Sequence, residues 1–151
     1  TFIIANSRVP SGSMENTIMT GDRVIGSRLS YKFHEPERGD IAIFHFPDDP
    51  TGKTLYVKRI IGLPGETVDI VDSQVYINGE PLDEPYIREP MDPEEPMHFE
   101  VPEGCYFMMG DNRNYSSDAR YWHNHYVAED QIIAKVLFRY YPFSKISWLD
   151  E

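Results

Sequence analysis

Two distant segments of the sequence carry side chains that together could perform nucleophilic catalysis. Ser11 and Ser13 flank Gly12 in a turn-rich segment, and Lys58 lies within an apolar run. A serine hydroxyl becomes a useful nucleophile when a base removes its proton, and a neutral lysine is a competent base. Backbone N–H groups at a glycine bend, with a second hydroxyl beside them, can form an oxyanion hole. Taken alone, however, a Ser-Gly-Ser tripeptide is an ordinary turn.

The surroundings expected for Lys58 favour a role as base. Alternation along a strand at residues 56–61 places Tyr56 and Ile60 on the same face as Lys58. A lysine among apolar groups loses hydration, its charged form is disfavoured, and its pKa falls. The alternative is a lysine whose stem is buried and whose ammonium reaches water.

A third segment, residues 110–122, is dense in small polar and charged side chains. Asp118 and Arg120 could pair there, and a hydroxyl could orient a base from behind. The alternative is a solvated loop. The aromatic pair Tyr121-Trp122 that closes the segment favours tight packing.

The elements that must position these residues are mostly strands. Val, Ile, Tyr and Phe are favoured over Leu, which suits a pleated, half-buried surface. Expected strands, bounded by Gly and Pro turns, lie at residues 23–29, 41–46, 54–61, 67–71, 74–77, 106–109 and 132–141. Residues 41–46 and 54–61 should form a hairpin, and only residues 128–132 suggest a short helix. The fold class is therefore mainly β.

Composition excludes several classes of protein. A formal charge of −11 would repel phosphate backbones, so no nucleic-acid partner is expected. The single cysteine, Cys105, permits no internal disulfide and is expected to be buried. No apolar run is long enough to span a bilayer. Residues 80–102, rich in Pro and acids, predict a loop or a small lobe.

The chemical segments resemble, in order and content, the sequence boxes of bacterial type I signal peptidases. Residues 11–17 match the box around the nucleophile, with Asn16 where the family has Pro. Residues 38–41 match an Arg-Gly-Asp box, residues 56–66 a lysine box, and residues 110–120 a Gly-Asp-Asn-Arg box. Four boxes in order, spread over most of the chain, are highly specific.

The resemblance implies a role for each matching residue. Ser13 would be the nucleophile and Lys58 the general base, and no cofactor or metal would be needed. The hydroxyl of Ser11, with the backbone N–H of Ser13, would form the oxyanion hole. Ser116 would hydrogen-bond the lysine, and Asp118 and Arg120 would form a supporting ion pair.

The resemblance also implies fold, substrate and location. The fold would be a β catalytic core, residues 1–65 and 103–151, with a small inserted β lobe at about 66–102, as in the compact Gram-positive members. Partners would be signal peptides of secretory preproteins, cut after Ala-x-Ala. A membrane anchor would precede Thr1 and hold the catalytic domain on the extracytoplasmic side of the cell membrane.

Shallow apolar pockets would give the family its preference for small residues. By position, Met14, Ile18 and Val57 would line the first pocket. The third-residue pocket would be lined by Val9, Val24, Ile43 and Val57. Substrate would lie extended and add a strand beside residues 7–9 and 54–57.

Four other interpretations stay open at this level. A Ser-His-Asp triad could use His45, although no Gly-x-Ser-x-Gly elbow is present. His123 and His125 could share a strand face, but a zinc site needs more ligands. A self-cleaving repressor-type peptidase also pairs Ser with Lys. A non-catalytic β-module that binds extended peptides is the remaining alternative.

Overall fold

The computed structural model describes residues 4–8, 14, 23–27, 31, 34–87, 89–141 and 147–148, and it describes side chains at 14, 31, 34–87 and 89–137. Ser11, Ser13, Val9 and Ile18 therefore lie outside the described residues. The described chain is mostly strand, as the sequence predicts. Among the described residues, Tyr31 is helical and two 3-10 helices of three residues each are present, and no helix in these ranges is long and apolar enough to cross a membrane.

The elements follow one another as β1 (Ile4–Arg8), β2 (Arg23–Ser27), β3 (Ile41–His45), β4 (Leu55–Gly62), β5 (Thr67–Val71), β6 (Gln74–Ile77), β7 (Glu80–Pro81), β8 (Met97–Glu100), β9 (Cys105–Met109), η1 (Arg113–Tyr115), β10 (Val127–Ala128), η2 (Glu129–Gln131), β11 (Ile132–Tyr141) and β12 (Ser147–Trp148). The predicted bounds of β5, β6 and β11 are correct, and those of the other predicted strands differ from these by a residue or two. The short helix suggested at 128–132 is present as the three-residue 3-10 helix η2.

The larger sheet has the order β1-β2-β11-β3-β4-β9-β10, with β12 pairing β11. Its centre is the predicted hairpin, in which Ile41 pairs with Arg59 and His45 with Leu55. The first four residues of β3 are buried, which explains their almost unbroken apolar run. This hairpin carries Lys58 at a central position of the sheet.

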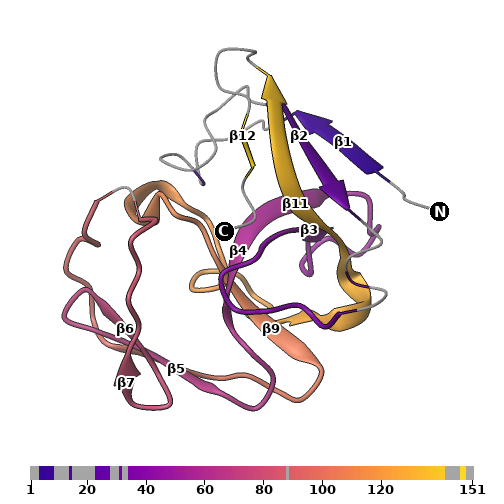
Figure 1. The fold of residues 1–151 in the computed structure, drawn as a ribbon. Helices are drawn as coiled ribbons and strands as arrows, with labels where there is room; N and C mark the ends of the chain where they lie inside the picture. The colour runs from indigo at the N-terminus through magenta and orange to yellow at the C-terminus, as the bar shows by residue number, and fades with distance from the viewer. Residues whose placement is uncertain are drawn as a thin grey trace.

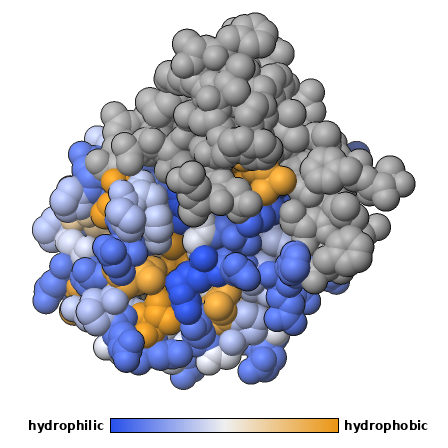
Figure 2. Space-filling view, in the orientation of Figure 1, coloured by the Kyte–Doolittle hydropathy of each residue, from blue (hydrophilic) through white to orange (hydrophobic). Residues whose placement is uncertain are grey.

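The smaller sheet has the order β7-β6-β5-β8 and is built from residues 67–100. Asn78 and Gly79 both have positive φ, 51° and 84°, as a tight hairpin turn from β6 to β7 requires. In Figure 1 this sheet lies at the opposite end of the molecule from β1 and β2, with β4 and β9 between them. The face over β5–β7 is mostly hydrophilic, with some apolar surface between the polar side chains (Figure 2).

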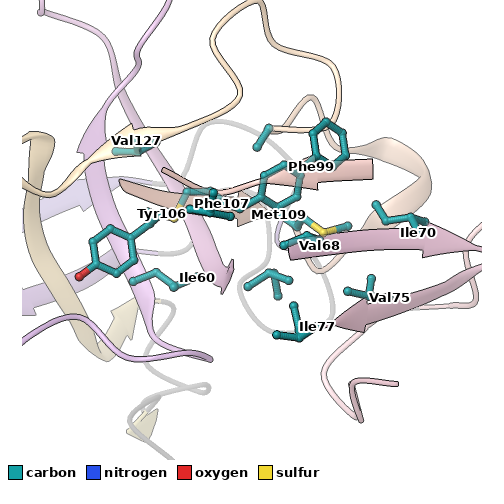
Figure 3. Packing of buried hydrophobic residues seen from close by; sticks show 14 of the residues in the cluster. Ile60, Val68, Ile70, Val75, Ile77, Phe99, Tyr106, Phe107, Met109 and Val127 are labelled. Carbon is teal, nitrogen blue, oxygen red and sulfur yellow. The ribbon is translucent and has the colours of Figure 1, made fainter. Parts of the chain in front are cut away.

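One hydrophobic cluster runs through both sheets (Figure 3). Ile60 and Phe107 contribute to it from the larger sheet, and Val68, Val75 and Phe99 from the smaller. The smaller sheet therefore shares its core with the larger one. The division into a core and an inserted lobe at about 66–102 stays a prediction.

A second cluster covers the other face of the hairpin. It contains Met14, Ile41, Ile43, Ala134 and Val136, with Val57 packed against it. Alternation along β3 thus sends its side chains to two separate cores.

Gly62 marks the point where the sheets meet. Its strand pairing with Phe107 follows a register shift in β4, and a Cβ there would lie 2.7 Å from Val68 and 2.9 Å from Phe107. No larger residue fits without moving the packed backbone and side chains.

We predict that Gly62→Ala lowers the free energy of unfolding by about 2 kcal/mol, because it overpacks the junction. Gly52→Ala is the control. A Cβ at residue 52 would meet no atom within 4 Å, but the backbone there has a φ of +68°. Backbone strain alone should therefore cost about 1 kcal/mol. Urea unfolding measures both, and an equal loss at the two sites would contradict the packing argument.

Candidate active site

Lys58 is buried, with 4% of its surface exposed. It faces Ala42 across the β3–β4 hairpin, where the small alanine leaves room for a long side chain. The amine Nζ lies 5.4 Å from the ring centroid of Tyr56, two residues away on the same strand. The sequence expectation that Lys58 lies among apolar neighbours is therefore correct, and its ammonium does not reach freely into water.

The ring of Tyr56 belongs to an aromatic cluster beside the amine. It stacks on Phe46 at 4.3 Å and meets Trp122 edge-on at 5.7 Å, while Phe44 lies 6.4 Å away. These rings come from β3 and the residue that follows it, from β4, and from the end of the 110–122 segment. Together they exclude water from one side of Lys58.

Burial lowers the pKa of Lys58 from 10.5 to about 8, and desolvation is the main cause. The negative charge of Asp118 raises this pKa, and the positive charge of Arg120 lowers it. At mildly alkaline pH a large fraction of the amine is therefore neutral and has a lone pair that can accept a proton.

Asp118 and Arg120 form a buried ion pair. Arg120 Nε and Nη2 donate to the two carboxylate oxygens at 2.8 and 2.9 Å. Asp118 also accepts the N–H of Gly110 at 3.0 Å, and Arg120 donates to the carbonyl of Arg113 at 2.7 Å. The pair thus closes the 110–120 segment into a fixed loop, as its polar composition suggested.

Ser116 is also buried, and its hydroxyl has no hydrogen-bond partner among the described residues. The expected bond from Ser116 to Lys58 is therefore not made in this structure, where the amine lies against the ring of Tyr56 instead. A buried hydroxyl without a partner carries a desolvation cost. A new bond to Ser116 would consequently be favourable.

Met14, the residue that follows Ser13 in the sequence, is anchored in the structure. It is 1% exposed, and its Sδ accepts the backbone N–H of Asp111 at 3.3 Å. It therefore ties the serine-bearing segment to the 110–120 loop. Sequence reasoning placed Met14 only in a pocket, because nothing in a sequence predicts a thioether acceptor.

The predicted pocket residues are brought together in part. Met14, Ile43 and Val57 lie in one cluster, whereas Val24 lies in β2, which β11 separates from β3. Two strand spacings amount to about 10 Å. A pocket shared by Val24 and Ile43 stays a prediction.

Two further ion pairs join the predicted boxes. Arg59 Nε and Nη2 donate to Asp111 at 2.8 and 2.7 Å, which links β4 to the 110–120 loop. Arg38 donates to both oxygens of Glu66, at 2.6 and 2.9 Å. Sequence reasoning did not single out Arg59 or Asp111. The alternation that buried Lys58 on one face could have suggested a partner for Arg59 on the other.

The histidines considered as ligands serve other contacts. The backbone of His123 binds Asp48, and the ring of His125 lies 2.6 Å from the carbonyl of Ala119 and against Phe99. Within the described ranges, no group of three His, Cys, Asp or Glu side chains is arranged to hold a metal ion. Cys105 is half-buried, and burial raises the pKa of its thiol, which disfavours the nucleophilic thiolate.

Comparison with known proteins gives consistent results. The family described as "Signal peptidase, peptidase S26" matches residues 1–141. A signal peptidase I of Leptolyngbya laminosa is 39% identical over 99% of this chain and 74% of its own length. A signal peptidase I of Bacillus caldolyticus is 37% identical over 97% of this chain and 85% of its own length. The crystal structure of a signal peptidase I from Enterococcus faecalis is 35% identical, covers 68% of this chain and 97% of its own, and has a TM-score of 0.56.

The burial of Lys58 leads to a prediction about stability. Its pKa is about 8 in the folded chain against 10.5 unfolded, so below pH 8 the folded state carries a penalty of about 3 kcal/mol. Lys58→Met should therefore raise the free energy of unfolding by about 2–3 kcal/mol at pH 6. The gain should shrink as the pH rises from 8 towards 10.5.

Urea unfolding at several pH values measures this difference. Lys53→Met is the control, because Lys53 is exposed in the β3–β4 loop and its loss should change little at any pH. A gain at Lys58 that does not depend on pH would contradict the desolvation argument.

Proposed function

The chain belongs to the signal peptidase family, peptidase S26, and on this premise we propose that it removes signal peptides with Ser13 as nucleophile and Lys58 as general base. The observation that carries this proposal is the buried Lys58 amine, whose pKa of about 8 suits proton abstraction. Ser13 lies outside the described residues, and the anchoring of Met14 beside the 110–120 loop supports its assignment.

The proposed reaction follows the general course of acyl transfer. Neutral Lys58 takes the proton of the Ser13 hydroxyl as its oxygen attacks the scissile carbonyl. The Ser13 N–H and the Ser11 hydroxyl stabilise the oxyanion. The intermediate collapses to an acyl-enzyme as Lys58 returns the proton to the leaving amine, and Lys58 then activates water for deacylation. In this scheme Ser116 orients the amine, and Asp118 with Arg120 fixes the loop behind it.

The edge of β4 supports binding of an extended substrate. The Thr54 carbonyl and both polar backbone groups of Ile60 bond towards β3 and the turn before it, so by alternation the backbone groups of Leu55 and Val57 point the other way. The partner on that side, β9, begins its pairing only at Arg59. Among the described strands, nothing pairs with Leu55 and Val57 there, and a peptide can add as a strand.

The side chains at this edge support a preference for small residues. Met14, Ile43 and Val57 form an apolar cluster with little free space. An alanine methyl suits such a surface, and a larger side chain would need it to open. We therefore propose cleavage after Ala-x-Ala, with secretory preproteins as substrates at the extracytoplasmic face of a membrane.

The central experiment is cleavage of a lipid-inserted signal peptide that ends in Ala-x-Ala. The wild-type chain should cut after the final Ala, as seen by mass spectrometry. Ser13→Ala and Lys58→Ala should each lower the rate at least about a thousandfold. Ser117→Ala, at an exposed serine beside Ser116, should retain full activity. Equal rates for wild type and Ser13→Ala would place the chemistry elsewhere.

The pH dependence of kcat/KM tests the role of Lys58. Because the base must be neutral, the rate should rise with pH through an apparent pKa of about 8. Asp118→Asn removes the charge that raises this pKa and leaves Arg120 unopposed, so the acid limb should move to lower pH. Asp92→Asn, at an exposed position, should leave the profile unchanged. An unmoved limb in Asp118→Asn would mean that the limb reports another group.

A further inference from the structure

Two buried arginines hold the start of the 110–120 loop. Arg59 follows Lys58 in β4 and binds the carboxylate of Asp111 with two nitrogens, while its third donates to the carbonyl of Gly39 at 2.7 Å. Arg113 donates from Nε to the carbonyl of Gly110 at 2.8 Å. The backbone that faces Met14 and the strand that carries Lys58 are therefore joined through these guanidinium groups.

Both arginines meet side chains from the segment that follows β7. Glu84 binds Arg113 through both carboxylate oxygens, at 3.0 and 2.5 Å, and its side chain is only 6% exposed. The ring centroid of Tyr86 lies 4.0 Å from the Cζ atom of Arg59 and 6.0 Å from that of Arg113. The Tyr86 hydroxyl donates to Glu84 at 3.1 Å. One short segment thus contacts both guanidinium groups at once.

The smaller sheet fixes this segment in place. The N–H of Leu82 donates to the carbonyl of Val75 at 2.9 Å, and the amide of Gln74 donates to the carbonyl of Leu82 at 2.9 Å. Gln74 and Val75 belong to β6, and Val75 packs in the hydrophobic cluster that both sheets share. The smaller sheet therefore holds Glu84 and Tyr86 in contact with the two arginines.

Charge balance shows why Glu84 matters. Arg59, Arg113 and Arg120 are paired with Asp111, Glu84 and Asp118, one carboxylate to each arginine. Removing one partner of a buried pair leaves an uncompensated charge, which is far more costly than never having the pair. An unpaired Arg113 would be drawn towards water and would pull the carbonyl of Gly110 with it.

We propose that Glu84 and Tyr86 are positioning residues for catalysis, and that through them the smaller sheet sets the position of the Lys58 strand against the 110–120 loop. Glu84 neutralises Arg113, and Tyr86 holds Arg59 by stacking. The inference rests on the proposed function, because its readout is the activity of Lys58 as a base. It assigns a role to a segment that composition alone describes as a loop or small lobe rich in Pro and acids.

The test measures kcat and KM for signal-peptide cleavage between pH 6 and 10. Glu84→Gln removes the charge and keeps the shape, and Tyr86→Leu removes the ring and keeps an apolar side chain. Tyr86→Phe keeps the stacking face, and Asp83→Asn makes the same charge change as Glu84→Gln at an exposed neighbour. Each variant is assayed at a temperature where its circular dichroism spectrum matches that of the wild type.

We expect Glu84→Gln and Tyr86→Leu to lower kcat about tenfold to a hundredfold with KM within about twofold. The acid limb should also move to higher pH, because a loosened loop admits water to Lys58 and relieves its desolvation. The charges that act on Lys58 are those of Asp118 and Arg120, so the loss of the Glu84 charge does not itself explain that movement. Asp83→Asn should match the wild type, and Tyr86→Phe, which keeps the ring but loses the hydroxyl bond to Glu84, should lower kcat less than Tyr86→Leu does.

Two results would overturn the inference and leave the proposed function intact. One is wild-type kcat and pH profile in both Glu84→Gln and Tyr86→Leu. The other is a loss of kcat that equals the unfolded fraction, with an unmoved acid limb, since that indicates a purely structural role. If the wild type itself cleaves no better than Ser13→Ala, it is the proposed function that fails.

Discussion

The desolvation of one amine is the constraint on which the rest of this structure depends. A lysine at the centre of a sheet loses most of its hydration. The charged form of its amine is then disfavoured, and its pKa falls. Ala42 opposite Lys58 and the rings around Tyr56 create that environment. A carboxylate close to the amine would stabilise its charged form again and raise the pKa of Lys58. The partners that bind the nearby carboxylates therefore matter.

Four carboxylates of the surrounding scaffold are each held by an arginine. Asp118 is committed to Arg120 and Asp111 to Arg59, and Glu66 and Glu84 are bound in the same way by Arg38 and Arg113. Guanidinium groups suit this task because they stay charged and bind carboxylates through two donors. A carboxylate without such a partner close to Lys58 would raise the pKa of its amine. These ion pairs thus limit how far the buried carboxylates can raise the pKa of Lys58.

Strand positions and the Lys58 environment could be predicted from the sequence because both arise from local alternation. The β5 and β6 strands were predicted to the residue, and the β3–β4 hairpin with its turn was also correct. The strand β8 was missed, because four residues after an acidic, Pro-rich stretch form a strand only when β5 supplies a pairing partner. The contacts of Glu84 with Arg113 and of Met14 with Asp111 could not be predicted for the same reason, since each joins residues distant in the chain.

The shared core explains why such distant residues can act together. Side chains from both sheets pack in one cluster, so the smaller sheet cannot shift without disturbing Ile60 and Phe107 of the larger. Packed interiors transmit small displacements because they contain little free volume. Strand β4 lies at this junction and carries Val57, Lys58 and Arg59 to three different environments. A strand that packs on both faces and pairs with β3 holds an unfavourably buried amine in place more firmly than a loop could.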